Sequence, residues 1–195
     1  MKRVLMGAGA ALLLVGSLGV GAPGAARAQA ADGNTVDVPV SAGGTATNSD
    51  TNQTQTVTLN GTFHVSRFVA QDNQLYAMGA LDGTLSDQNG NTVATVTDQP
   101  QQVTTEAITS SCNNLDVQVG PANIPAVESG STWTVSINQL DLGITGAHPA
   151  SGVAQFALCS LADATGGSVQ LSSGNLPVSA SDLARALNGL LGIIS

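Results

Sequence analysis

Basic side chains are nearly absent from this chain of 195 residues, which has five Lys and Arg, 13 Asp and Glu, and a net charge of −8. Three of the five cations precede residue 31, so only Arg67 and Arg185 remain beyond it. Proteins bind nucleic acid and anionic lipid largely through Lys and Arg. The small number of Lys and Arg residues therefore excludes nucleic acid as a partner. We expect the excess of acidic residues to keep the protein soluble.

Aromatic residues make up only 3% of the chain, and there are two histidines. Few aromatics disfavour sugar binding by stacking and leave few anchors for a tight protein interface. The sequence contains no G-x-S-x-G, S-x-x-K or H-E-x-x-H motif. We expect His64 on the exposed polar face of a strand and His148 in a turn, with no catalytic residue, no cofactor and no metal site.

Acidic residues are numerous enough to raise two further possibilities. A carboxylate pair could hydrolyse a glycoside, but most of the acids fall in predicted turns, where Asp commonly bonds the local backbone. Residues 87–91 (DQNGN) offer oxygen ligands for calcium, yet they lack the glycine position and the final Glu of an EF-hand loop. A hairpin turn explains the same residues without a metal.

Residues 1–30 have the three parts of a secretory signal peptide. Lys2 and Arg3 precede an apolar run from Val4 to about Val20, and Ala28 and Ala30 form an A-x-A cleavage site. We expect cleavage after Ala30, with retention as an anchor as the alternative. No later stretch is long and apolar enough to span a membrane. The protein is therefore expected to be secreted, either released or held at the cell envelope.

The chain has two cysteines, Cys112 and Cys159. Export favours oxidation, so a disulfide is expected, and it would close a loop of nearly fifty residues. Such a loop stabilises the folded state by about 4 kcal/mol through the entropy of the unfolded chain. A reactive thiol is the alternative, but neither cysteine has a basic neighbour in the sequence to lower its pKa.

The composition divides the chain after the signal into two parts. Residues 31–55 combine a short strand at Thr35–Val40 with a polar segment that has no hydrophobic period, which predicts a flexible stretch. Residues 56–195 are expected to form a single β-rich domain.

Within that domain, apolar residues alternate with polar ones, which is typical of half-buried strands. Asp72-Asn73 predicts a turn, and Asn89-Gly90 predicts a type I′ hairpin. Pro100 is expected to interrupt a strand. Arg67 occupies an apolar position. This indicates a twist or bulge there, a pairing with an aspartate while the side-chain stem covers apolar surface, or an anchor for an acidic ligand. The alternation covers residues 57–65, 75–85, 93–96, 103–108, 115–119 and 133–144, and the last run changes phase near 138–139, as a bulge or a break between two strands would.

Two later segments change to helical spacing. Apolar residues of 153–164 recur at helical intervals, and Gly166-Gly167 follows as a C-terminal cap would. Apolar residues of 183–194 form one helical stripe. Ser179 and Asp182, just before this stripe, form an approximate capping box. The predicted fold is therefore α+β, mainly β. We expect an antiparallel sandwich or half-open barrel of about six to eight strands, with two short helices on its C-terminal side.

Two blocks carry a resemblance. The first contains Gly61-Thr62-Phe63, Val65, Arg67-Phe68, Gln74-Leu75, Ala77, Gly79, Leu81 and Gly83-Thr84-Leu85; the second contains Cys112, Leu115, Val117, Val119, Gly120-Pro121, Leu140, Leu142, Ile144 and Phe156 to Ala162. Over roughly residues 60–165 the chain resembles a family of small secreted bacterial proteins of unknown function. It differs from the family at 123–125 and 128–130, where a leucine-rich stretch is replaced. The resemblance implies that Cys112 and Cys159 pair and tie a helix to a strand.

These observations favour an exported, non-catalytic interaction module of unknown partner. The second hypothesis is a carrier that encloses a small apolar ligand, and a hydrolase ranks last. The oligomeric state does not follow from the sequence.

Overall fold

The computed structural model describes residues 35–128, 130–145, 152–171 and 178–195. These residues form nine strands and two helices, and the predicted α+β, mainly β class is confirmed. The strands are β1 (Val36–Asn48), β2 (Thr54–Gln71), β3 (Gln74–Ser86), β4 (Thr92–Ser110), β5 (Asn114–Val119), β6 (Ala122–Glu128), β7 (Ser131–Ile137), β8 (Leu140–Thr145) and β9 (Ser168–Gln170); the helices are α1 (Gly152–Thr165) and α2 (Ala180–Ile194).

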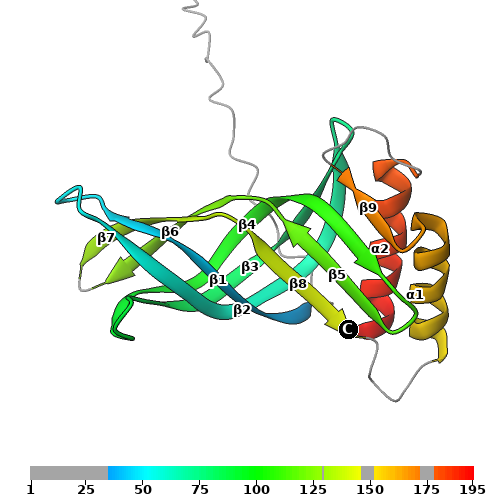
Figure 1. Ribbon diagram of the computed structural model, residues 1–195, viewed down its shortest axis with the longest axis horizontal. Coiled ribbons are helices and arrows are strands. Elements are labelled where there is room, and N and C mark those ends of the chain that lie inside the picture. Colours follow the sequence, from blue (N-terminus) through cyan, green and yellow to red (C-terminus); the bar gives the residue numbers. More distant parts are fainter. Residues whose placement is uncertain (1–34, 129, 146–151, 172–177) are drawn as a thin grey trace, which may run out of the picture.

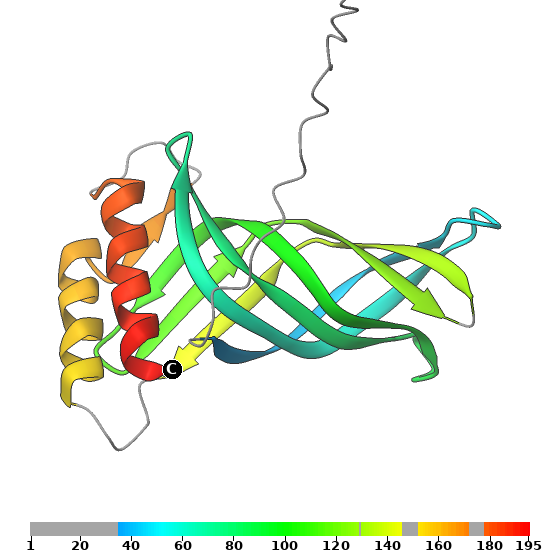
Figure 2. The same cartoon turned by 180° about the vertical axis from the view of Figure 1, so that it is seen from behind.

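The strands pair antiparallel in the order β3-β2-β1-β7-β6-β4-β5-β8, and β9 pairs with β4. β3 also pairs with β4. The strands therefore form a closed ring of pairings, in the order β3, β2, β1, β7, β6, β4 and back to β3. The sheet therefore curls around its core. Both helices lie side by side at one end of the elongated body (Figure 1). Figure 2 shows the same pair from behind, where α2 lies against β2.

The core is built from the alternating positions of the strands. In β2, for example, Val57, Leu59, Phe63 and Val65 are buried, as the two-residue period predicts. Gly61 interrupts this apolar series because it faces Gly83 across the pair, and a Cβ on Gly61 would collide with the backbone of β3. One buried cluster runs through all the long strands and includes residues of both helices.

The N-terminal polar segment is the clearest correction to the sequence-based prediction. Residues 41–48 are not flexible; they continue β1, which pairs with β2 over most of its length and with β7 from Gly44 onward. The small side chains of Ala42 and Ala46 are buried in this strand. A segment with little hydrophobic surface is ordered here because its backbone bonds to strands on both edges.

The type I′ turn predicted at Asn89-Gly90 is found instead at Asp72-Asn73. Asp72 and Asn73 both have positive φ, 52° and 60°, and form the two-residue β2–β3 turn that a type I′ geometry requires. At the β3–β4 turn only Gly90 has a positive φ, and its amide donates to the Asp87 carbonyl at 3.1 Å. The hairpin at Asn89-Gly90 is thus confirmed, but its turn is not type I′: residues 87–91 separate the two strands, and of Asn89 and Gly90 only the glycine is in the left-handed region.

Pro100 does not end a strand, contrary to the prediction. β4 is continuous from Thr92 to Ser110, and Pro100 pairs with Ala80. The irregularity lies two residues earlier, where the register shifts and Asp98 has a φ of 46°. Pro100 is tolerated because it lies between the segments of β4 that pair with β6 and β5, where β3 is its strand partner.

Residues Ala122–Glu128 form β6, a strand that the sequence analysis did not predict. Ala122, Ile124 and Ala126 face the core between exposed residues. The phase change after Ile137 is a break between two strands: β7 pairs with β1 and β6, whereas β8 pairs with β5.

Both predicted helices are confirmed, with ends close to the expected positions. After α1, Gly166 and Gly167 have positive φ, and the Gly167 amide donates to the Ala162 carbonyl at 2.8 Å, as in a C-terminal glycine cap. At the start of α2, the Ser179 hydroxyl accepts the Asp182 amide at 3.2 Å. The apolar stripe of α2 packs against the sheet, chiefly on β2.

Candidate functional site

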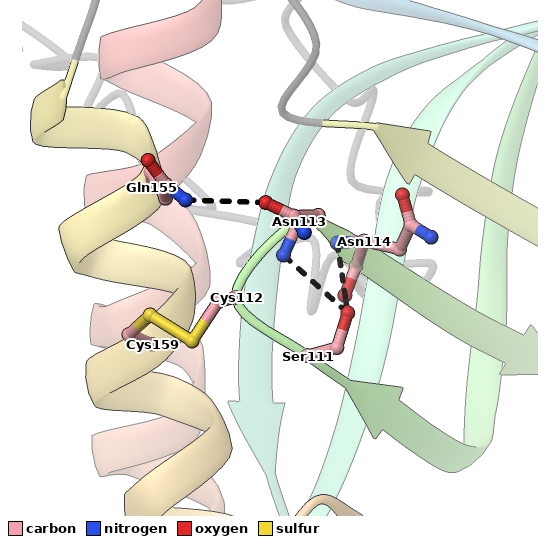
Figure 3. Close-up of a disulfide and its surroundings, with 6 residues drawn as sticks. All are labelled: Ser111, Cys112, Asn113, Asn114, Gln155 and Cys159. Atoms are coloured by element: carbon pink, nitrogen blue, oxygen red, sulfur yellow. Dashed lines mark hydrogen bonds between the residues drawn. A yellow bond between two sulfur atoms is a disulfide. The ribbon is translucent and has the colours of Figure 1, made fainter.

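Cys112 and Cys159 form a disulfide that joins the β4–β5 turn to the middle of α1 (Figure 3). Cys112 lies within a turn that Ser111 closes. The Ser111 amide donates to the Asn114 carbonyl at 2.8 Å, and the Ser111 hydroxyl accepts the Asn114 amide at 3.1 Å. The disulfide expected from export is therefore present, and it ties a helix to the turn before β5.

Two further contacts hold α1 on either side of the disulfide. Near its start, Gln155 Nε2 donates to Oδ1 of Asn113 at 3.2 Å (Figure 3). At its end, the hydroxyls of Thr165 and Ser110 lie 3.0 Å apart and are both buried. A helix attached near its beginning, middle and end loses little further conformational freedom when its outer face is covered.

The second candidate site is a cluster of His64 with two aspartates on neighbouring strands. His64 Nδ1 lies 2.6 Å from Oδ1 of Asp37 on β1, and its Nε2 lies 3.0 Å from Oδ2 of Asp82 on β3. The other oxygen of Asp82 accepts the Asp98 amide at 2.7 Å. The cluster thus links three adjacent strands through side chains on the outer face of the sheet.

Charge within this cluster favours the imidazolium form of His64. The hydrogen bond with Asp37 raises the pKa of His64 above its usual 6.5, against the opposing effect of desolvation. The Asp98 amide is the main cause that lowers the pKa of Asp82, and His64 lowers it further. Both nitrogens can donate to carboxylates only when the ring is protonated.

This geometry is suited to fastening strands and poorly suited to catalysis. A histidine that acts as a general base needs one nitrogen free to accept a proton from a nucleophile or water. Here each nitrogen faces a carboxylate. The two carboxylates also lie at opposite ends of the ring, so the three side chains do not converge on a point where a metal ion could bind.

The parts of the chain that the structure describes contain no group of three or more His, Cys, Asp and Glu side chains that could hold a metal ion. In the turn considered for calcium, Oδ1 of Asp87 accepts the amides of Asn89 and Asn91, each at 2.8 Å, and Oδ2 accepts Nδ2 of Asn91 at 3.0 Å. These bonds use the carboxylate to close the turn.

Asp116 on β5 is a carboxylate that sequence reasoning did not single out. Its Oδ1 is buried and has no hydrogen-bond partner. Desolvation raises the pKa of Asp116, and the nearby charge of Asp141 raises it further. The pair is electrostatically unfavourable when both carboxylates are ionised.

Arg67, which the sequence placed at an apolar position of β2, is exposed. The β2–β3 register shifts between Val65 and Arg67, and this shift places Phe68 in the core instead. The sequence analysis offered a bulge as one explanation for Arg67 at an apolar position of the strand, and this bulge is confirmed. His148 and the cleavage-site residues Ala28 and Ala30 lie outside the described residues.

His64 itself was expected on the polar face, where it lies, but its partners were not predicted. Asp37 and His64 are 27 residues apart in the chain and become neighbours only through the β1–β2 register. The sequence held one signal for the position of Asp37. Side chains alternate between the two faces of a strand, and Asp37 lies between the inward residues Val36 and Val38, so its side chain is expected to face outward.

Comparison with protein-family models, curated proteins and solved structures finds no match to this chain. Neither α1 nor α2, the two helices of the described residues, has the length and apolar character needed to cross a membrane.

Proposed function

We propose that the protein is exported and acts outside the cytoplasm as a non-catalytic interaction module, either released or held at the envelope. The observation that carries this proposal is the Cys112–Cys159 disulfide. Structural disulfides persist mainly in oxidising compartments, and residues 1–30 have the pattern of a signal peptide. The resemblance to small secreted bacterial proteins of unknown function is in keeping with it.

The geometry at His64 supports the non-catalytic part of the proposal. Both imidazole nitrogens are engaged by carboxylates of neighbouring strands, which leaves none to activate a nucleophile. The cluster lies on the outer face of the sheet, where it cross-links β1, β2 and β3.

The packed interior favours an interaction module over a carrier of a small apolar ligand. Phe63, Leu81 and Leu85 point into the curled sheet and are 0% exposed. A ligand cavity lined by these side chains would leave them with surface that a water-sized probe reaches. A hydrolase remains the least supported of the three functions.

The export claim is tested by expressing the full chain in bacteria and measuring the intact mass of the protein from medium, envelope and cytosol. We expect a chain beginning at Ala31 that is two hydrogens lighter than the reduced form. Ala30→Leu should block processing, because the cleavage site needs a small residue, whereas Ala26→Leu serves as the matched control. A cytosolic chain that retains Met1 and two free thiols would contradict export.

The non-catalytic claim is tested separately with purified oxidised protein and a panel of chromogenic esters and glycosides. We expect no turnover above that of a His64→Gln variant. Turnover by the wild type that this substitution abolishes would overturn the claim without affecting the export result.

A further inference from the structure

The chain contains three Asn-Gly pairs, at Asn60-Gly61, Asn89-Gly90 and Asn188-Gly189. Asparagine before glycine is chemically labile, because glycine has no Cβ to keep its amide nitrogen away from the carbonyl carbon of the asparagine side chain. The attack closes a five-membered ring, and the backbone beside the asparagine must rotate for the two atoms to meet. The surrounding structure therefore decides which of the three pairs can react.

Asn60-Gly61 is held by strand pairing on both sides. Asn60 lies in the middle of β2, where it pairs with Ser41 of β1 and Thr84 of β3. Its Oδ1 accepts the Ser41 hydroxyl at 2.8 Å. Rotation of the backbone here would break the pairing with both neighbouring strands, so local opening at this pair is rare.

Asn188-Gly189 is held by the contact between α2 and β2. Both ends of the Asn188 side-chain amide bond the backbone of Phe68. The pair also lies inside α2, whose backbone groups are bonded to one another along the helix. Cγ of Asn188 cannot approach the Gly189 nitrogen unless these bonds break, so this pair is protected as well.

Asn89-Gly90 has neither kind of protection. Residues 88–92 are exposed, and the β3–β4 turn projects from the end of the body opposite the helices (Figures 1 and 2). Asn89 donates its backbone amide, and more weakly its side chain, to the Asp87 carboxylate. The Gly90 amide donates to the Asp87 carbonyl at 3.1 Å. All these bonds lie within the turn, so the pair can react after the turn opens, while β3 and β4 stay paired.

We propose that Asn89 is the site at which this protein deamidates spontaneously, with water as the only co-reactant. The Gly90 amide nitrogen bonds to Cγ of Asn89, the Cγ–Nδ2 bond breaks, and ammonia leaves with the proton that the Gly90 nitrogen gives up. Water then opens the resulting succinimide at one of its two carbonyl carbons and leaves either aspartate or isoaspartate at position 89. The inference does not depend on export or on the proposed function, because it rests only on the folded domain.

The new carboxylate changes the turn in which it forms. Oδ1 of Asp87 accepts the amides of Asn89 and Asn91, each at 2.8 Å, so a carboxylate at position 89 places like charge beside an existing one. Isoaspartate also adds a methylene group to the main chain between these two amides, which displaces them relative to each other. The β3–β4 turn should therefore loosen as the protein ages, while the rest of the sheet keeps its pairing.

Peptide mapping by mass spectrometry tests the proposal on the purified, oxidised protein, incubated for weeks at mildly alkaline pH. Alkaline conditions favour the reaction because the Gly90 nitrogen must lose its proton. We expect the mass change from asparagine to aspartate at Asn89, with conversion at Asn60 and Asn188 slower by on the order of tenfold or more. An isoaspartyl methyltransferase assay should detect isoaspartate in the wild type and not in Asn89→Gln, whose longer side chain closes a ring far more slowly.

The reduced chain in guanidinium is the matched control for the fold. No pair is protected there, so all three asparagines should convert at similar rates. The proposal is overturned if Asn60 or Asn188 converts first in the folded protein, or if Asn89 stays intact over the time in which the unfolded chain converts. Rates that are as unequal in the unfolded chain as in the folded one would also overturn it, since neighbouring residues would then set the selectivity. Circular dichroism should show that Asn89→Gln folds like the wild type, because the substituted side chain is exposed.

Discussion

Asn188 on α2 bonds both backbone groups of Phe68 on β2: its Oδ1 accepts the Phe68 amide at 2.7 Å, and its Nδ2 donates to the Phe68 carbonyl at 2.8 Å. The paired register of β1 with β2 ends at Val65, so this edge of β2 continues past its strand neighbour. A side-chain amide with one acceptor and two donors replaces the missing strand there. The contact joins residues 120 positions apart and fixes α2 to the sheet.

Replacing Asn188 should destabilise the protein through the two backbone groups left without partners. We expect Asn188→Ala to lower the free energy of unfolding by about 1–3 kcal/mol, measured by urea denaturation. Asn188→Asp keeps the acceptor but loses the donor, so it should also destabilise. Equal stability of Asn188→Ala and the wild type would show that water replaces the amide.

The His64 cluster predicts a pH-dependent contribution to stability. Because the folded state raises the pKa of His64, its contribution is complete below the usual 6.5 and is lost as the pH rises through the folded value. The lowered pKa of Asp82 has the opposite sign: its contribution is present above the usual 3.8 and is lost as the pH falls through the folded value.

The wild type should therefore exceed His64→Gln in melting temperature by a few degrees at mildly acidic pH. The difference should shrink in strong acid and in base, and thermal melts between about pH 3 and pH 9 measure it. A difference that does not change with pH would mean that His64 acts by packing rather than by its charge.

Loss of the disulfide should cost much of the stability of the domain. The bond closes a loop with a sequence separation of 47 residues, which corresponds to about 4 kcal/mol in chain entropy. The Cys112→Ser, Cys159→Ser double variant and the reduced wild type should show the same lower midpoint in guanidinium. Hydrogen exchange in native conditions should increase first in α1, and uniform exchange throughout would contradict a local role for the bond.

Asp116→Asn should stabilise the protein near neutral pH. The substitution removes a carboxylate whose pKa is raised by burial and by the charge of Asp141, and changes of this kind contribute up to about 1 kcal/mol. The gain should disappear in acid, where Asp116 is already protonated. Asp50→Asn removes the same charge from an exposed turn and should leave the melting temperature unchanged.

Most strands and both helices could be predicted because their signals are local. The two-residue alternation in Val57, Leu59 and Val65 and the helical stripe of α2 are periodic within a few neighbouring positions, so the sequence is sufficient to determine which face is buried. The cap at Ser179 and the glycine end of α1 are local for the same reason. β1 beyond Val40 was mispredicted because its order comes from β2 and β7, which lie elsewhere in the chain.

By itself, the sequence determined the class of fold, the inward face of most strands, the helix ends and, through the expected export, the pairing of the only two cysteines. Only the tertiary structure decided which strands are neighbours, that the sheet pairings return to β3, and that Asp37 and Asp82 meet His64 from opposite sides. The physical reason is that backbone hydrogen bonds are chemically alike in every register. The register is chosen by the packing of side chains distant in sequence, which no short segment encodes.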